Sequence, residues 1–221
     1  TNVEEIDVFG EFNDPYKNFD DFLELATHNS LEVIVSNTTE AGIQFLENDQ
    51  ETDRPPSSFP AKLTLFLKKR FEIFPEKELH IVPCELIENN GAALKECILA
   101  YTDLWNLDEA FKSWVENHIQ FYNTLVDRIV PGHPGEAEDD KIRAIGEEDP
   151  FATIGEYYHQ WVIEKGESLE TILPLKSAGL NVIYPKELKP FRDRKVRVLN
   201  GAHTAMVSVG IRAKVETVGE L

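Results

Sequence analysis

The chain has 221 residues, and 42% of them are hydrophobic, which is enough apolar material for a sizeable folded core. Its formal net charge of −18 argues against nucleic-acid binding, because a protein that binds phosphates needs a basic surface. No apolar run approaches the roughly 20 residues that span a bilayer, and no signal peptide is visible. We therefore expect a cytoplasmic protein that contacts no membrane.

The first half of the chain alternates strand-like and helical patterns. In chain order, the predicted elements are an amphipathic helix over 19–26, a strand over 31–35, a helix capped by Ser58, a strand ending at residue 84, a helix over 90–105 and a helix capped by Asp108. This alternation is typical of an α/β fold built on a parallel sheet.

The second half changes in character. It contains a strand that leads into a turn near residue 131, a surface loop rich in Gly, Pro and charge over 131–150, strands within 156–166 and 180–184, and a helical pattern from Pro190 to the end. We place a boundary near residue 186. Residues 1–185 would form the sheet domain and residues 186–221 the start of a mainly helical domain.

The two cysteines, Cys84 and Cys97, predict reduced, buried thiols rather than a disulfide, because so few cysteines in a chain of this size are typical of a cytoplasmic protein. Their surroundings lack zinc-site spacing, so we expect no metal.

The segment 186–197, "KELKPFRDRKVR", holds six basic and two acidic residues in an acidic chain. It is either an ordinary solvated helix start or a local positive field for an anionic ligand, because clefts concentrate electrostatic fields. Composition alone favours the solvated helix start.

Two polar groups follow the first two predicted strands. Asn37, Thr38, Thr39 and Glu40 come after the first, and Asn89, Asn90 and Gly91 come after the second. The carboxyl ends of parallel strands are where α/β sheets bind ligands. Taken alone, the first group indicates a turn, and the local sequence of the second favours a helix cap by Asn89 or Asn90 over a site.

A third group lies in the helical segment "KVRVLNGAHTAMVSVG". On an α-helix, Asn200 lies about 140° and His203 about 80° around the axis from Lys195, so the three side chains share one arc. The spacing alone favours a partly exposed polar face over a site. Gly201 in mid-helix predicts close approach of another group to the backbone.

The segments "IVSNTTEAGI", "VPCELIENNGAALKE", "FYNTLVDRIVPG" and "RKVRVLNGAHTA" occur in this order in the long-chain mannitol dehydrogenase family, which the chain resembles over nearly its whole length. Residues 119–131 match the family signature position by position. The resemblance implies a Rossmann-like domain that leads into a mainly helical C-terminal domain. No Gly-rich cofactor turn (GxGxxG) occurs in the chain, so we expect the first strand and its turn to lie upstream.

The resemblance also implies roles for the polar groups. Lys195 would act as general acid/base, and Asn200 and His203 would bind and polarise the reacting oxygen. Asn90 would add a further donor, and no metal would be needed. Nearby arginines, we hypothesise, lower the pKa of the Lys195 amine.

The implied cofactor is NAD. Asn37, Thr38, Thr39 and Glu40 would lie near its nicotinamide end, with Asp127 beside the same cleft.

The implied substrate is a small sugar acid, since the segments are most similar to the branch of the family that interconverts D-tagaturonate and D-altronate in hexuronate catabolism. Fructuronate and mannitol-type substrates stay as alternatives. Mannitol-type members carry Asp-Asn where this chain has Glu85 and Leu86, which argues against mannitol. A non-catalytic sugar-acid-binding fragment is the other alternative, and the oligomeric state is not indicated.

Overall fold

The computed structural model describes residue 10, residues 12–132 and residues 153–221. A parallel sheet of three strands, β1 (Val33–Ser36), β2 (Leu79–Pro83) and β3 (Ile119–Phe121), lies in the order β1-β2-β3. The predicted α/β fold with a parallel sheet is confirmed. The predicted loop over 131–150 lies outside the described residues, apart from 131 and 132.

The central strand β2 is buried along its whole length, as expected for a strand covered on both faces. Successive side chains of a strand point to opposite faces, so Leu79 and Ile81 enter one apolar cluster while Val82 enters another. His80 lies on the Val82 side, where its Nδ1 is 2.8 Å from the hydroxyl of Tyr122.

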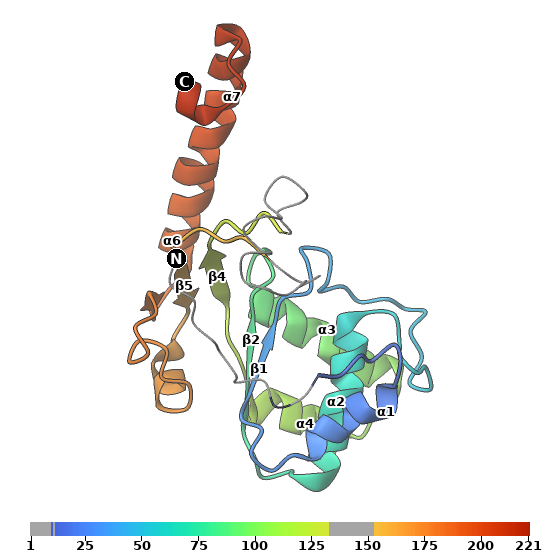
Figure 1. Cartoon of the computed structure of the whole chain (residues 1–221). Coiled ribbons are helices and arrows are strands. Elements are labelled where there is room, and N and C mark those ends of the chain that lie inside the picture. Colours follow the sequence, from blue (N-terminus) through green and yellow to red (C-terminus); the bar gives the residue numbers. More distant parts are fainter. Residues whose placement is uncertain (1–9, 11, 133–152) are drawn as a thin grey trace.

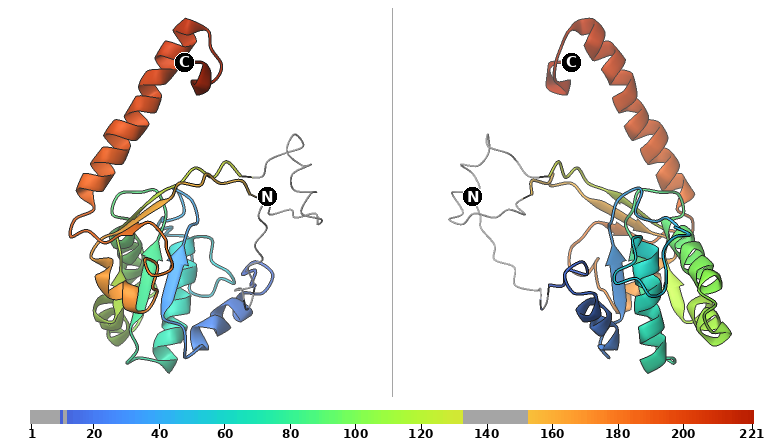
Figure 2. Two further views of the ribbon diagram at one scale, coloured as in Figure 1. Left: turned by 60° about the vertical axis from the view of Figure 1, so that its left-hand side comes forward. Right: turned by 90° about the vertical axis from the view of Figure 1, so that its right-hand side faces the viewer.

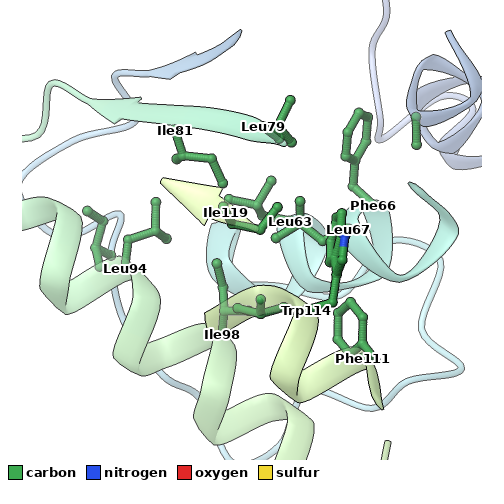
Figure 3. Close-up of a cluster of buried hydrophobic side chains, with 13 residues drawn as sticks. Leu63, Phe66, Leu67, Leu79, Ile81, Leu94, Ile98, Phe111, Trp114 and Ile119 are labelled. Carbon is green, nitrogen blue, oxygen red and sulfur yellow. The ribbon is translucent and has the colours of Figure 1, made fainter. Parts of the chain in front are cut away.

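Three helices cover the Ile81 face of the sheet: α2 (Phe59–Ile73), α3 (Asn90–Leu104) and α4 (Glu109–Asn117). Their apolar side chains meet those of the strands in the larger core cluster (Figure 3). The short helix α1 (Phe19–Glu24) continues into a 3-10 turn, η1 (Leu25–Thr27), and packs beside α2.

Local sequence signals set the helix starts. The hydroxyl of Ser58 accepts a hydrogen bond from the amide of Ala61, and the carboxylate of Asp108 accepts one from the amide of Ala110. Both predicted N-caps are therefore confirmed, and each satisfies a backbone N–H that has no partner within its helix.

A second sheet packs against the other face of β2. It contains β4 (Thr124–Asp127), β5 (Gln160–Ile163) and β6 (Val182–Ile183), with β4 antiparallel to β5 and β5 parallel to β6. The 3-10 helix η3 (Gly166–Thr171) contributes Leu169 to the apolar cluster between the two sheets. The chain passes from the first sheet to the second within two residues, between β3 and β4.

The C-terminal arm (residues 189–221) projects away from this two-sheet body in every view (Figures 1 and 2). It consists of α6 (Lys189–Asp193), a π-helical turn labelled η4 (Arg194–Asn200), α7 (Gly201–Ala213) and η5 (Val218–Glu220). The prediction of a helix to the chain end is wrong beyond Ala213, because Lys214 adopts a left-handed conformation (φ 58°) and reverses the chain. Among the described residues, no helix is long and apolar enough to cross a membrane.

Candidate functional site

Glu85, directly after β2, ties together the carboxyl ends of the first two strands. Its buried carboxylate accepts hydrogen bonds from the Ser36 hydroxyl at 3.0 Å, from the Thr38 amide at 3.0 Å and from the Thr38 hydroxyl at 2.9 Å. A buried carboxylate needs such donors, because desolvation otherwise makes its charge costly. The loop after β1 is therefore fixed beside the loop after β2.

Asn90, at the start of α3, is fully buried in the same region. Its amide nitrogen donates to the carbonyls of Pro83 and Glu85 and toward Thr124, and its oxygen accepts from the amides of Gly91 and Thr124. This geometry gives Asn90 an architectural role. A donor role toward substrate stays a prediction that these bonds do not support. The predicted capping bond of Asn89 is absent, and that residue adopts a left-handed conformation (φ 51°).

Gly91 is the glycine that permits a close backbone approach. A Cβ atom at this position would lie 2.3 Å from the carbonyl oxygen of Tyr122. By contrast, a Cβ at Gly201 would meet its nearest neighbour, the Val196 carbonyl oxygen, at 3.8 Å, an ordinary contact distance. Among the described residues, none makes the predicted close approach at Gly201. The approach at Gly91 lies where α3 packs on the β3–β4 connection.

The strand ends and the arm enclose a cleft of about 180 Å³, the reactive cleft. The loop after β1 contributes Glu40, the loop after β2 contributes residues 85–88, and β4 contributes Thr124 and Leu125. Leu188, just before the arm, and Arg192, Lys195, Val196 and Asn200 of the arm close the cleft. The cleft thus lies at the carboxyl edge of the parallel sheet, where α/β proteins bind ligands.

Lys195 is anchored at the junction of two hollows. Its side chain is 16% exposed, and its Nζ donates to the Val126 carbonyl at 2.6 Å and pairs with the Asp127 carboxylate at 3.1 Å. The lysine lines the reactive cleft and also a neighbouring hollow of about 340 Å³ that contains Asp127 and Tyr158. Since an ammonium has three donors, these two bonds leave one N–H for a ligand.

The π-helical turn changes the geometry that α-helical spacing predicted. In a π-helix the hydrogen bonds run from i to i+5, so residues five apart lie one turn apart on the same side. Lys195 and Asn200 are five apart within Arg194–Asn200, and both line the reactive cleft. The α-helical spacing placed them about 140° apart at the two sides of the predicted shared arc. The structure therefore brings this pair together.

His203 lies beyond the π turn, on α7. It is exposed and lines a different hollow of about 270 Å³, together with Met206 and Gly210. It is absent from the residues that line the two hollows containing Lys195. The predicted convergence of three side chains is thus limited here to Lys195 and Asn200, and a role for His203 stays a prediction.

The three arginines near Lys195 are engaged by other groups. Arg192 pairs with the Glu88 carboxylate, Arg194 donates to the Gln160 side chain at 2.8 Å, and Arg197 pairs with Asp193 at 3.6 Å. The charged partner of Lys195 is instead a carboxylate, that of Asp127. This arrangement does not support the hypothesis that the arginines act on the amine.

The predicted cofactor residues Asn37, Thr38, Thr39 and Glu40 are all exposed and lie in the loop that Glu85 fixes. The amide and the hydroxyl of Thr38 both donate to Glu85, whereas Glu40 lines the reactive cleft.

Cys84 lies next to this loop. Burial chiefly, and the neighbouring Glu85 charge secondarily, raise the pKa of the Cys84 thiol to about 12, which keeps it protonated and unreactive near neutral pH.

Both cysteines are free thiols, as predicted. Cys84 is buried as predicted, whereas Cys97 is only half-buried. Within the described ranges, no group of three or more His, Cys, Asp or Glu side chains is arranged to hold a metal ion.

Comparison with known proteins identifies the family. The family model of the mannitol dehydrogenase Rossmann domain matches residues 1–177. The chain belongs to the mannitol dehydrogenase family. Two relatives named altronate oxidoreductase, from Bacillus subtilis (strain 168) and Halalkalibacterium halodurans, are 44% and 43% identical over 208 and 209 residues. Each alignment covers 93% of this chain but only 43% and 41% of the relative, so the chain spans less than half the length of these family members.

Solved structures of two dehydrogenases share the fold. A D-sorbitol dehydrogenase in substrate-free form matches 89% of this chain and 42% of its own, with a TM-score of 0.71 and 23% identity. A Pseudomonas fluorescens mannitol 2-dehydrogenase in ternary complex with NAD and D-mannitol matches the same shares, with a TM-score of 0.68 and 20% identity.

Two residues of this family member's cleft were not recognised as site residues from the sequence. Glu85 was noted only as a departure from mannitol-type relatives, and Arg192 only as part of a basic stretch and as one of the arginines near Lys195. A carboxylate that directly follows a buried strand was the available signal for Glu85.

Proposed function

We propose that this chain forms the greater part of the catalytic site of a cytoplasmic NAD-dependent oxidoreductase that interconverts D-tagaturonate and D-altronate. The observation that carries the proposal is the anchored amine of Lys195, which shares the reactive cleft with Asn200 at the carboxyl edge of the sheet. The names of the altronate oxidoreductases from two bacilli support the choice of substrate.

Lys195 holds and moves the proton of the reaction. When a ketone is reduced, its oxygen becomes an alkoxide. The third N–H of Lys195, which is not bonded to Val126 or Asp127, donates a proton to this alkoxide. In the reverse direction the amine takes the proton from the alcohol. Asn200 donates from its side-chain amide to the same oxygen and so stabilises the negative charge that develops there.

NAD would supply or accept the hydride. The family and the NAD-bound mannitol 2-dehydrogenase support this cofactor. The exposed polar loop 37–40 fits the nicotinamide end of such a molecule, because it offers amide and hydroxyl donors beside the reactive cleft. Asn37 and Thr39 are the better candidates for direct contacts, since both donors of Thr38 are bonded to Glu85.

The domain division follows from the same proposal. Residues 1–185 would belong to the dinucleotide-binding domain and residues 186–221 would begin the helical substrate domain, so that the cleft lies between them. The bonds of Lys195 to β4 would then be contacts between domains.

The test is to measure NADH oxidation by the full-length protein with tagaturonate, fructuronate and fructose, and by the 221-residue chain in parallel. We expect tagaturonate to give the highest kcat/KM. A preference for fructuronate or fructose would assign the protein to another substrate of the family. Failure of all three substrates, combined with measurable binding of altronate, would favour a sugar-acid-binding protein instead.

A further inference from the structure

Arg192 differs from the other basic residues of its segment in where it lies. It is three residues before Lys195, and both side chains line the reactive cleft. Residues three apart on a helix are surface neighbours, with about 5–6 Å between their Cβ atoms. Arg197 is 76% exposed and pairs within the arm, and Arg194 lines the neighbouring hollow instead. Arg192 therefore brings a positive charge to the same cleft as Lys195.

The present partner of Arg192 is Glu88, from the loop after β2. The side chain of Arg192 is 35% exposed, and the side chain of Glu88 is 62% exposed. Exposed ion pairs contribute little to stability, because water competes for both charges. A ligand carboxylate that enters the cleft can therefore replace Glu88 at small cost.

The shape of the guanidinium also matters. It presents several N–H donors in a planar fork that matches the two oxygens of a carboxylate, whereas an ammonium offers only a point charge. A keto acid of the proposed class carries its carboxylate several carbons from the ketone, so recognition of the two ends needs two separated groups. Lys195 with Asn200 supplies one of them, and Arg192 supplies the other.

We infer that Arg192 binds the carboxylate of the sugar acid and thereby selects an acid over the neutral sugar. When the cleft is empty, Glu88 pairs with the guanidinium instead. This inference rests on the proposed function, since it assigns the second end of the same substrate. It names Arg192 as a binding and specificity residue, separate from the proton transfer at Lys195.

The test compares kcat/KM for tagaturonate with kcat/KM for the neutral ketohexose that has a hydroxymethyl group in place of the carboxylate. In the full-length protein, Arg192→Met removes the charge and keeps the side-chain length. We expect kcat/KM for tagaturonate to fall about 10- to 100-fold, the range for losing a hydrogen bond to a charged group, while the value for the neutral sugar changes less than about threefold. Arg192→Lys should recover only part of the loss.

Arg197→Met is the matched control, because that arginine lies in the same segment and lines neither hollow of Lys195. Equal losses for the acid and the neutral sugar in Arg192→Met would overturn the inference, as would a selective loss in Arg194→Met with Arg192→Met unaffected. Both outcomes leave the proposed function standing, because the unmodified protein would still reduce tagaturonate.

A binding measurement makes the test independent of turnover. Calorimetry with altronate and with the hexitol altritol compares the acid and its neutral counterpart. We expect the unmodified protein to prefer altronate and Arg192→Met to lose that preference. Equal affinities in the unmodified protein would overturn the inference, whereas failure of the proposed function would appear as absent turnover with every substrate.

Discussion

The two-sheet body and the C-terminal arm differ in what surrounds their apolar side chains. In the body, β2 is buried throughout and its side chains enter two apolar clusters. In the described arm, α6, the π turn and α7 contain no buried residue, and Val207, Val209 and Ile211 are among its exposed side chains. The body has a core of its own, whereas the arm is held by polar contacts at its base.

This difference shows where the proposed chemistry is anchored. The body fixes the strand ends through Glu85 and Asn90, and the arm contributes Lys195 and Asn200. The amine is held by β4 through Val126 and Asp127 rather than by apolar packing of its own helix. The reactive cleft therefore depends on polar bonds at the junction.

The largest effect is expected where the arm enters the cleft. Lys195→Met removes the proposed acid/base while keeping the side-chain length, so kcat should fall about 100- to 10,000-fold, the usual contribution of such a group. NADH oxidation by the full-length protein with saturating tagaturonate measures the loss. Circular dichroism should show an unchanged fold.

Lys189→Met serves as the control for Lys195→Met, because Lys189 is 74% exposed and pairs with Asp193 within the arm. We expect near-normal turnover for this control. Near-normal turnover in Lys195→Met itself would remove the lysine from the mechanism and with it the observation that carries the proposed function.

The next prediction compares the stability of the two regions directly. Ile81→Ala leaves a cavity in the larger cluster and should lower the free energy of unfolding by about 2–5 kcal/mol. Val209→Ala, at a side chain that is 55% exposed, should change it by no more than about 0.5 kcal/mol. Urea unfolding measures both. A large loss in Val209→Ala would mean that the arm is covered in solution.

The sequence predicted the secondary structure of the body more fully than that of the arm. Most strands, the caps at Ser58 and Asp108 and the helices of the body were recognisable, because buried faces and caps leave local patterns. The three-residue strand β3 was not predicted. Lys195 and Asn200 were also recognised, as was the strand edge. The π turn was not, since i to i+5 bonding has no signature in α-helical spacing. The partners of Glu85 and Asn90 lie up to 49 residues away in the chain, and only the folded structure brings them together.

A smaller effect is expected within the body, at the strand ends. Glu85→Gln keeps the size of the side chain but turns one acceptor oxygen into an NH₂ donor that faces the donors of Ser36 or Thr38. We expect a loss of about 1–3 kcal/mol in the free energy of unfolding, measured by urea, because a buried donor is left without an acceptor.

Glu88→Gln is the control for Glu85→Gln, since Glu88 follows the same strand but is 62% exposed. We expect it to change stability by less than about 0.5 kcal/mol. Equal effects in the two variants would show that the Glu85 bonds do not hold the strand ends.

The smallest effect concerns pH, and it also belongs to the body. Burial chiefly lowers the pKa of His80, partly offset by the charges of Glu78 and Glu32. The unfolded chain, with a histidine pKa of about 6.5, therefore binds a proton more readily than the folded one, so lower pH favours unfolding. The contribution is complete above about pH 6.5 and is lost as pH falls through the lower folded pKa. Its slope cannot exceed about 1.4 kcal/mol per pH unit.

Urea unfolding between pH 7.5 and 5.5 measures this slope, and His80→Gln should flatten it. Glutamine cannot titrate in this range, yet it can still form a hydrogen bond with the Tyr122 hydroxyl that His80 contacts at 2.8 Å. His28→Gln, at an exposed position, should leave the slope unchanged. A slope that survives in His80→Gln would place the titrating group elsewhere. A slope that disappears would show that the buried face of β2, rather than the exposed arm, makes this fold sensitive to mild acid.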